Sequence, residues 1–89
     1  MGITKSAALE GAEHGVRVNA VLPRTIDTGM SRGLVSVRPD VWDGLVENIP
    51  LGRAGQPDEV AEAAAWLCSG RSSFVTGHGL VVDGGRSAG

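Results

Sequence analysis

The sequence predicts an α/β fold in which a crossover helix joins two parallel strands. Two short apolar segments with β-branched residues, 16–22 and 79–83, are the predicted strands. Residues 57–69, which lie between them, have the apolar spacing of an amphipathic helix. A strand, a helix and a second strand in this order favour a parallel pair with a right-handed crossover.

A first helix is expected over residues 2–14, where Ile3, Ala7 and Ala8 recur at near-helical spacing. Gly15 follows at the place where a left-handed C-terminal cap is expected. Gly11 inside the segment costs about 1 kcal/mol relative to alanine. We therefore expect a helix that is not strong by itself.

The first strand, residues 16–22, is expected to end at Pro23, and Arg17 and Asn19 interrupt one of its faces. Residues 23–33 are rich in Thr, Gly and Asp and are expected to form a loop. After a less decided segment, residues 39–48 could form a short helix, with Val41, Trp42, Leu45 and Ile49 as its apolar side.

The clearest helix is predicted over residues 57–69. Pro57 fits the first helical position, and Asp58 and Glu59 place negative charge at the positive end of the helix dipole. Gly70 is expected to end this helix. After the second strand, the run Asp83-Gly84-Gly85 is interpreted as a strand exit, because no helix follows it to complete a phosphate loop.

Size and composition exclude several classes of function. At 89 residues the chain is one small domain at most, and a net charge of −2 without a basic cluster argues against nucleic-acid partners and anionic membrane surfaces. No apolar run approaches the ~20 residues of a membrane span. The single cysteine, Cys68, is expected to be a buried helix residue and fits a cytoplasmic location. His14 and His78 lack the spacing of metal ligands, so no metal site is predicted.

Two strands are too little sheet for a stable α/β domain. Parallel sheets are covered by helices on both faces, and isolated two-stranded sheets are rarely stable. A domain of this size also buries only about 60–65% of its unfolded surface. We therefore expect the isolated chain to be marginally stable.

Three segments carry a family resemblance: TKSAALEGAEHGVRVNAVLPRTIDTGM, PLGRAGQPDEVAEAAAWLCS and SSFVTGHGLVVDGG. In order and spacing they are similar to the C-terminal segment of classical short-chain dehydrogenase/reductases, over residues 2–85. The resemblance implies a partial Rossmann-like, doubly wound α/β fold whose last two parallel strands are residues 16–22 and 79–83. Residues 23–50 then resemble the region of the cofactor and substrate loops.

The same resemblance places the catalytic machinery of the family outside this sequence. The Tyr and Lys of the family motif Tyr-x-x-x-Lys would precede Met1, and the catalytic Ser and the glycine-rich loop would lie earlier still. The sequence contains no tyrosine. It therefore resembles a truncated enzyme without catalytic residues, expected to be inactive alone. Its intact relative would transfer hydride between NAD(P)(H) and a carbonyl or alcohol.

The resemblance also implies a nicotinamide-binding loop. The family motif Pro-Gly-x-Ile/Val-x-Thr corresponds here to Pro23-Arg24-Thr25-Ile26-Asp27-Thr28. It implies that NAD or NADP is held by Pro23, Ile26 and Thr28, with the Ile26 backbone pairing with the carboxamide. The Thr28 hydroxyl would bond the carboxamide or a phosphate oxygen. The alternative is that Ile26 is an apolar plug and Thr28 an ordinary turn residue.

Arg24 stands where the family has glycine. If that position requires a positive φ or a close approach to the ligand, arginine there costs about 1 kcal/mol or blocks the site. Alternatively, Arg24 reaches a cofactor phosphate. Residues 29–50 resemble a mobile segment that closes over substrate, the alternative being an ordinary pair of surface helices.

Two other functions remain open on the sequence. The first is a non-catalytic interaction module, because family members pair through their long helices and final strand, which implies a homo- or hetero-oligomer with related subunits. Trp66 is expected to pack, in this case against another subunit. The second is a stand-alone binder of a small ligand.

Arg53 is expected to anchor its loop through backbone carbonyls.

Overall fold

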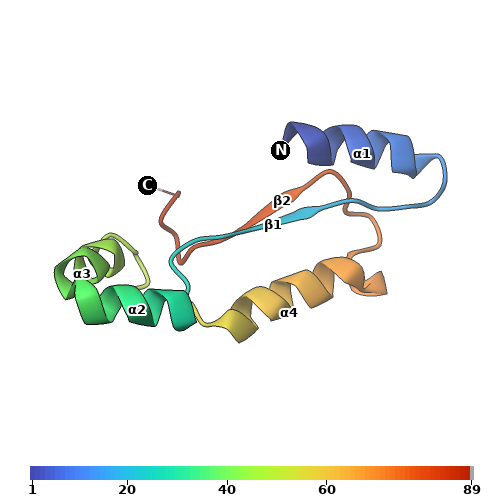
Figure 1. Ribbon diagram of the computed structural model, residues 1–89. Helices are drawn as coiled ribbons and strands as arrows, with labels where there is room; N and C mark the ends of the chain where they lie inside the picture. Colours follow the sequence, from blue (N-terminus) through green and yellow to red (C-terminus); the bar gives the residue numbers. More distant parts are fainter. Residues whose placement is uncertain (89) are drawn as a thin grey trace.

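The computed structural model describes residues 1–88. Strands β1 (Ala20–Pro23) and β2 (Gly79–Val82) pair in parallel, with Ala20 opposite Gly79 and Pro23 opposite Val82. Figure 1 shows α1 (Gly2–Ala12) on one side of this pair and α4 (Pro57–Cys68) on the other. The remaining elements are α2 (Gly29–Val37), α3 (Pro39–Glu47) and the 3₁₀ turn η1 (Gly70–Ser72). The predicted α/β fold with parallel strands is confirmed.

Helix α1 ends at Ala12, two residues before the predicted end. The chain reverses at Gly15, whose φ of +71° is the left-handed conformation predicted for it, and the Val16 N–H donates to the Gly11 carbonyl at 2.9 Å. A Cβ at Gly11 would lie 2.9 Å from the Val16 carbonyl oxygen. Gly11, which costs helix stability, is therefore the position that lets the returning chain pass close to the helix.

The first strand begins later than predicted. Over residues 16–19 one backbone bond joins the two segments, from the Gly77 N–H to the Val18 carbonyl at 2.7 Å, and side chains supply others. The His78 N–H donates to Asn19 Oδ1, and Asn19 Nδ2 donates to the Val75 carbonyl, both at 3.0 Å. The prediction of a strand over residues 16–22 was therefore wrong at its start, whereas Pro23 is the last residue of β1, in line with the predicted end.

Arg17 joins the beginning of this segment to the turn after α4. Its guanidinium donates to the Ser72 hydroxyl at 3.1 Å and to the carbonyls of Val75 and Ser69 at 3.1 and 3.0 Å. Ser72 is only 2% exposed. The sequence showed Arg17 only as an interruption of an apolar face, whereas the structure makes it the centre of a polar cluster that fixes the ends of two elements.

Helix α4 covers one face of the sheet and ends at Cys68, one residue before the predicted end. Leu67 is buried, but Cys68 is exposed, so the prediction of a buried cysteine was wrong. Cys68 borders an open hollow between α4 and the approach to β1, which Arg17, Val21 and Leu67 also line. The side of α4 that carries Cys68 is therefore exposed to solvent.

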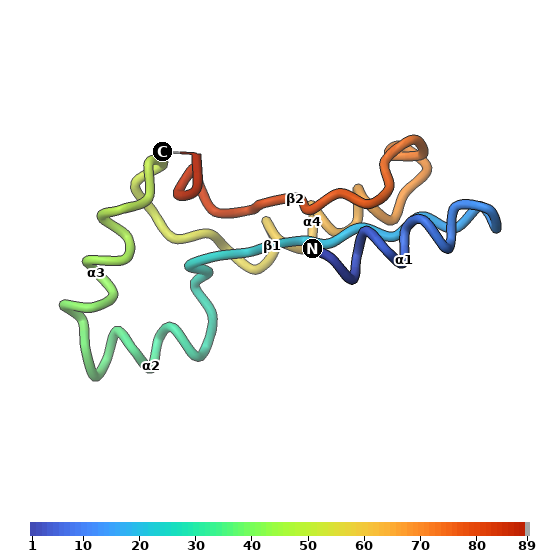
Figure 2. Tube along the Cα trace, turned by 90° about the horizontal axis from the view of Figure 1, so that it is seen from above, coloured from blue at the N-terminus to red at the C-terminus, as the bar shows by residue number. Residues whose placement is uncertain are grey.

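The molecule is elongated, with principal extents of 49 × 23 × 20 Å and a radius of gyration of 15.8 Å. A compact domain of this length would have a radius of gyration of about 12 Å. Figure 2 shows the pair α2 and α3 at one end and the turn after α1 at the other. The buried apolar side chains are Ala8, Ile49 and Leu67. Within residues 1–88 the core is therefore very small.

Candidate functional site

The loop that follows β1 leaves the sheet at the carboxyl ends of both strands. It is held by Gly55, whose N–H donates to the Thr25 carbonyl at 3.1 Å and whose carbonyl accepts from the Asp27 N–H at 2.8 Å. Ile26 lies between these two bonds. In a parallel bridge the N–H and carbonyl of the central residue point away from the partner. Neither group of Ile26 has a hydrogen-bond partner within residues 1–88, so both are available to a ligand.

The backbone strain in this loop lies at Thr25, not at Arg24. Thr25 has a φ of +56°, a left-handed conformation that costs a β-branched residue about 1–2 kcal/mol. Arg24 is not in that region, because its N–H still donates to the Val82 carbonyl at 3.2 Å and continues the parallel ladder. The expected penalty for an arginine with positive φ at position 24 is therefore absent.

Thr28 is the N-cap of α2. Its hydroxyl accepts from the Ser31 N–H at 3.4 Å, and the Ser31 hydroxyl accepts from the Thr28 N–H at 2.6 Å. The prediction of a loop over residues 23–33 was wrong from Gly29 onward, because this reciprocal cap starts a helix there. The Thr28 hydroxyl accepts one bond and keeps its own proton free to donate.

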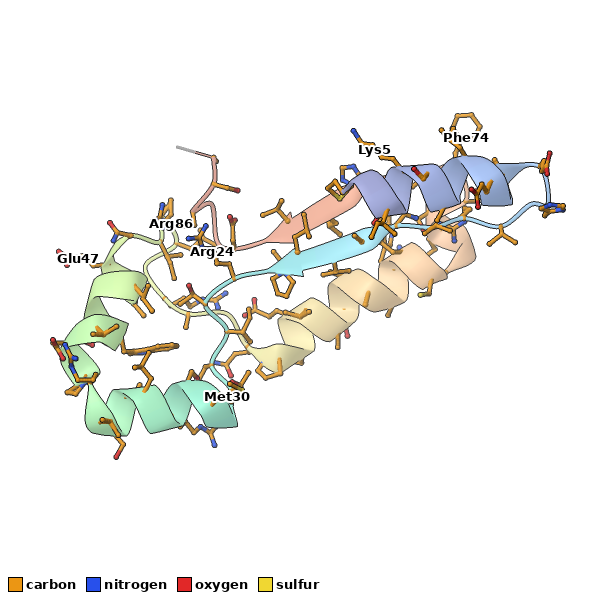
Figure 3. The ribbon with its side chains drawn as sticks, turned by 45° about the horizontal axis from the view of Figure 1, so that its top comes forward. Lys5, Arg24, Met30, Glu47, Phe74 and Arg86 are labelled. Atoms are coloured by element: carbon orange, nitrogen blue, oxygen red, sulfur yellow. The ribbon has the colours of Figure 1, made fainter. Side chains whose placement is uncertain are left out.

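The three predicted cofactor residues thus lie along one continuous stretch. Pro23 is exposed at the end of β1, Ile26 follows in the loop, and Thr28 begins α2. The positive end of the α2 dipole also lies at Thr28, which favours a negatively charged group nearby. Figure 3 shows Met30, 90% exposed, at the start of this helix. Whether these residues bind a cofactor stays a prediction.

Arg53 fixes the segment before α4 mainly through a carboxylate. It donates to both oxygens of Glu59, at 2.8 and 3.0 Å, and to one carbonyl, that of Ala54, at 3.2 Å. Glu59 also accepts the Gln56 N–H at 2.9 Å and so caps the helix, in line with its predicted place at the helix start. The bonds from Arg53 and then from Gln56 lower the pKa of Glu59 to about 2.

This pKa gives the start of α4 a dependence on pH. Because the folded pKa of Glu59 is below its ordinary value of 4.5, its contribution is present above that value and is lost as the pH falls toward about 2. In Glu59→Gln, we expect the acid-induced loss of helicity between these values to shrink, as followed by circular dichroism. Asp58→Asn, one residue away, should keep the transition. An unchanged titration in Glu59→Gln would contradict the prediction.

Within residues 1–88 no three side chains of the metal-ligating types lie close enough together to hold an ion. His14 and His78 are both exposed. No helix in the same range is long and apolar enough to cross a bilayer.

Known proteins match the part of the sequence that forms this strand, loop and helix. A family model described as enoyl-(acyl carrier protein) reductase matches residues 1–87. The chain belongs to the short-chain dehydrogenase/reductase family. A short-chain dehydrogenase of Pyricularia oryzae is 42% identical over 87 residues, which are 98% of this chain and 31% of the relative. An A-factor type γ-butyrolactone 1'-reductase (1S-forming) of Streptomyces virginiae is 49% identical over 85 residues, 96% of this chain and 33% of the relative.

Solved structures agree with the fold. A candidate 2-deoxy-D-gluconate 3-dehydrogenase from Agrobacterium tumefaciens, crystallised with NADP, superposes with a TM-score of 0.92 at 38% identity. The superposition covers 99% of this chain and 35% of that protein. The partial Rossmann-like fold of the family is thereby confirmed. The chain spans about a third of the length of the curated relatives it matches.

Proposed function

We propose that this chain is the nicotinamide-binding end of an NAD(P)-dependent oxidoreductase that transfers hydride between the cofactor and a carbonyl or alcohol. The observation that carries the proposal is the backbone of Ile26, which Gly55 holds in place while its N–H and carbonyl have no partner within residues 1–88. A carboxamide presents one acceptor and one donor, which complement these two groups. The bound cofactor would supply the hydride, and this chain would orient its nicotinamide end.

The remaining residues of the loop fit the same ligand. The free proton of the Thr28 hydroxyl can be donated to a carboxamide or phosphate oxygen, and the α2 dipole favours a phosphate. Pro23 offers an exposed apolar ring at the end of β1. The sequence has no tyrosine to act as the family's proton donor. The chain alone is therefore expected to be inactive, and we expect it in the cytoplasm.

The surface area supports a role within a larger body. The accessible surface is 6150 Å² for a mass of 9.1 kDa. A compact protein of this mass exposes about 4900 Å². The excess, about 1250 Å², exceeds what one partner loses in an ordinary protein interface, about 800 Å². The chain therefore exposes more surface to water than a compact protein of its mass normally does.

A chimera tests the proposal. The matching third of the Streptomyces virginiae reductase is replaced by this chain, and the purified product is assayed with NADH and NADPH. We expect the chimera to reduce the relative's substrate and the 89-residue chain to show no turnover. A folded chimera that fails to bind either cofactor, measured by quenching of its tryptophan fluorescence, would refute the proposal.

The hydroxyl of Thr28 should matter for cofactor binding in this chimera. Thr28→Ala removes one hydrogen bond to the cofactor, so the KM for the cofactor should rise by about three- to tenfold. Thr28→Ser keeps both the hydroxyl and the helix cap and should stay near the parent. Equal KM values in the Ala and Ser variants would show that the hydroxyl does not contact the cofactor.

A second candidate function is pairing with a full-length homologue. Apolar side chains on α1 favour it, because Ile3 is 88% and Leu9 78% exposed. Trp66 on α4 is 41% exposed and could pack against the same partner. Co-expression with a full-length relative should then yield a complex that Leu9→Glu weakens and the matched change Lys5→Glu does not. Failure of the parent chain to co-purify would exclude this function.

A further inference from the structure

A cavity of about 210 Å³ lies beyond the carboxyl ends of the two strands, beside the cofactor loop. Its apolar wall is formed by Ile49, Leu51 and Val81, and its far side by the turn Gly84-Gly85 that follows β2. Arg24 reaches it from the end of β1. Pro23, Ile26 and Thr28 do not line it, so this cavity is distinct from the proposed nicotinamide site.

The two carboxylates that border the cavity are already satisfied. Both oxygens of Glu59 accept from Arg53. The oxygens of Asp83 accept the backbone N–H groups of Gly85 at 3.0 Å and Ser87 at 2.9 Å. The bonds to Glu59 also occupy the guanidinium of Arg53. None of the three groups needs a ligand to complete its hydrogen bonds.

Arg24 and Gly84, unlike these three groups, have hydrogen-bond donors without an acceptor. Within residues 1–88 the Arg24 guanidinium makes no hydrogen bond and no ion pair, and the Gly84 N–H donates to no acceptor. Both residues line the same cavity. A planar guanidinium with a free fork of N–H groups is the side chain best suited to hold a carboxylate through two parallel hydrogen bonds. The two residues that carry these donors therefore line the same cavity as the apolar side chains of Ile49, Leu51 and Val81.

We propose that this cavity binds a small organic carboxylate, with its charged group on Arg24 and its hydrocarbon chain against Ile49, Leu51 and Val81. A single negative charge matches the guanidinium of Arg24, which makes no hydrogen bond within residues 1–88 and acts on the nearby carboxylate of Asp83 only through its charge. A phosphate with two charges would meet stronger repulsion from the carboxylates of Asp83 and Glu59. The proposal does not depend on hydride transfer, because it concerns a different group of residues.

Binding is tested by nuclear magnetic resonance on the ¹⁵N-labelled 89-residue chain and, in parallel, on the chimera. Butyrate is added at constant ionic strength, and inorganic phosphate serves as the comparison anion. We expect saturable shifts of the Arg24 side-chain and Gly84 backbone resonances with butyrate, at concentrations on the order of millimolar, and much smaller shifts with phosphate.

Two variants distinguish binding at this cavity from nonspecific attraction of the anion to positive charge on the surface. Arg24→Gln keeps a polar side chain with an N–H donor but removes the charge, and it should weaken butyrate binding by about tenfold or more. The matched control is Arg86→Gln, because Arg86 lies at the same end of the molecule (Figure 3) without lining the cavity. It should change the affinity less than about twofold. Equal losses in the two variants, an unaffected Arg24→Gln, or no saturable shift in either host would overturn the proposal.

Discussion

Replacing Gly84 with valine is expected to lower the free energy of unfolding by about 2–5 kcal/mol. A Cβ at this position would lie 2.6 Å from Cγ2 of Ile49, which is one of the few buried side chains. Gly84 also has a φ of +63°, a conformation that costs a β-branched residue about 1–2 kcal/mol. The close contact and the strain add, because no exposed side chain can move aside to relieve them.

Urea unfolding of the chimera, followed by circular dichroism, measures this loss. Gly33→Ala is the control, because nothing lies within 4 Å of a Cβ at Gly33 in α2. It should raise the free energy of unfolding by up to about 1 kcal/mol. If Gly84→Val unfolds at the urea concentration of the parent, the close packing of residues 49–51 on the turn after β2 is wrong.

Arg17→Met should cost about 3 kcal/mol, because it removes three hydrogen bonds that join distant segments. The most costly of these is the bond to the Ser72 hydroxyl, which is 2% exposed and has little access to water as a replacement. The carbonyls of Ser69 and Val75 each lose one donor, although Val75 keeps Asn19 Nδ2 and Ser69 keeps the N–H of Ser72. Because these groups lie 52 to 58 residues from Arg17 in sequence, the variant should also loosen the turn after α4.

Arg71→Met is the control for this prediction. Arg71 is exposed, and its guanidinium makes no hydrogen bond within residues 1–88, so the change should stay within about 0.5 kcal/mol. Thermal and urea unfolding of the two variants side by side give the comparison. If both variants lose similar amounts of unfolding free energy, the hydrogen bonds of Arg17 contribute little to stability beyond the charge of its side chain.

Local patterns predicted what is local in this fold. The proline at the start of α4, the glutamate two residues later and the left-handed glycine after α1 each act through neighbouring backbone groups. The parallel pairing of the strands followed from their order with a helix between them, and the family motifs added the assignment to the Rossmann-like fold. The motifs also predicted which residues form the loop after β1, and its role in cofactor binding stays a prediction.

The errors fall where distant segments decide the structure. Asn19 was interpreted as a strand residue, but it lies before β1, and its side chain bonds to the backbone of Val75 and His78. Cys68 was expected to be buried, yet no segment within residues 1–88 covers its flank of α4. The start of α2 had a weak local signal, the pair Thr28 and Ser31 in a cap that more often uses Glu or Gln at its third position.

The long, thin form of the molecule affects how its association state has to be measured. With one extent of 49 Å against two of 23 and 20 Å, a monomer experiences more friction in water than a sphere of the same 9.1 kDa. It should leave a gel-filtration column ahead of round standards of equal mass. Light scattering or sedimentation equilibrium reports mass without that bias, and an early peak on the column is no sign of a dimer.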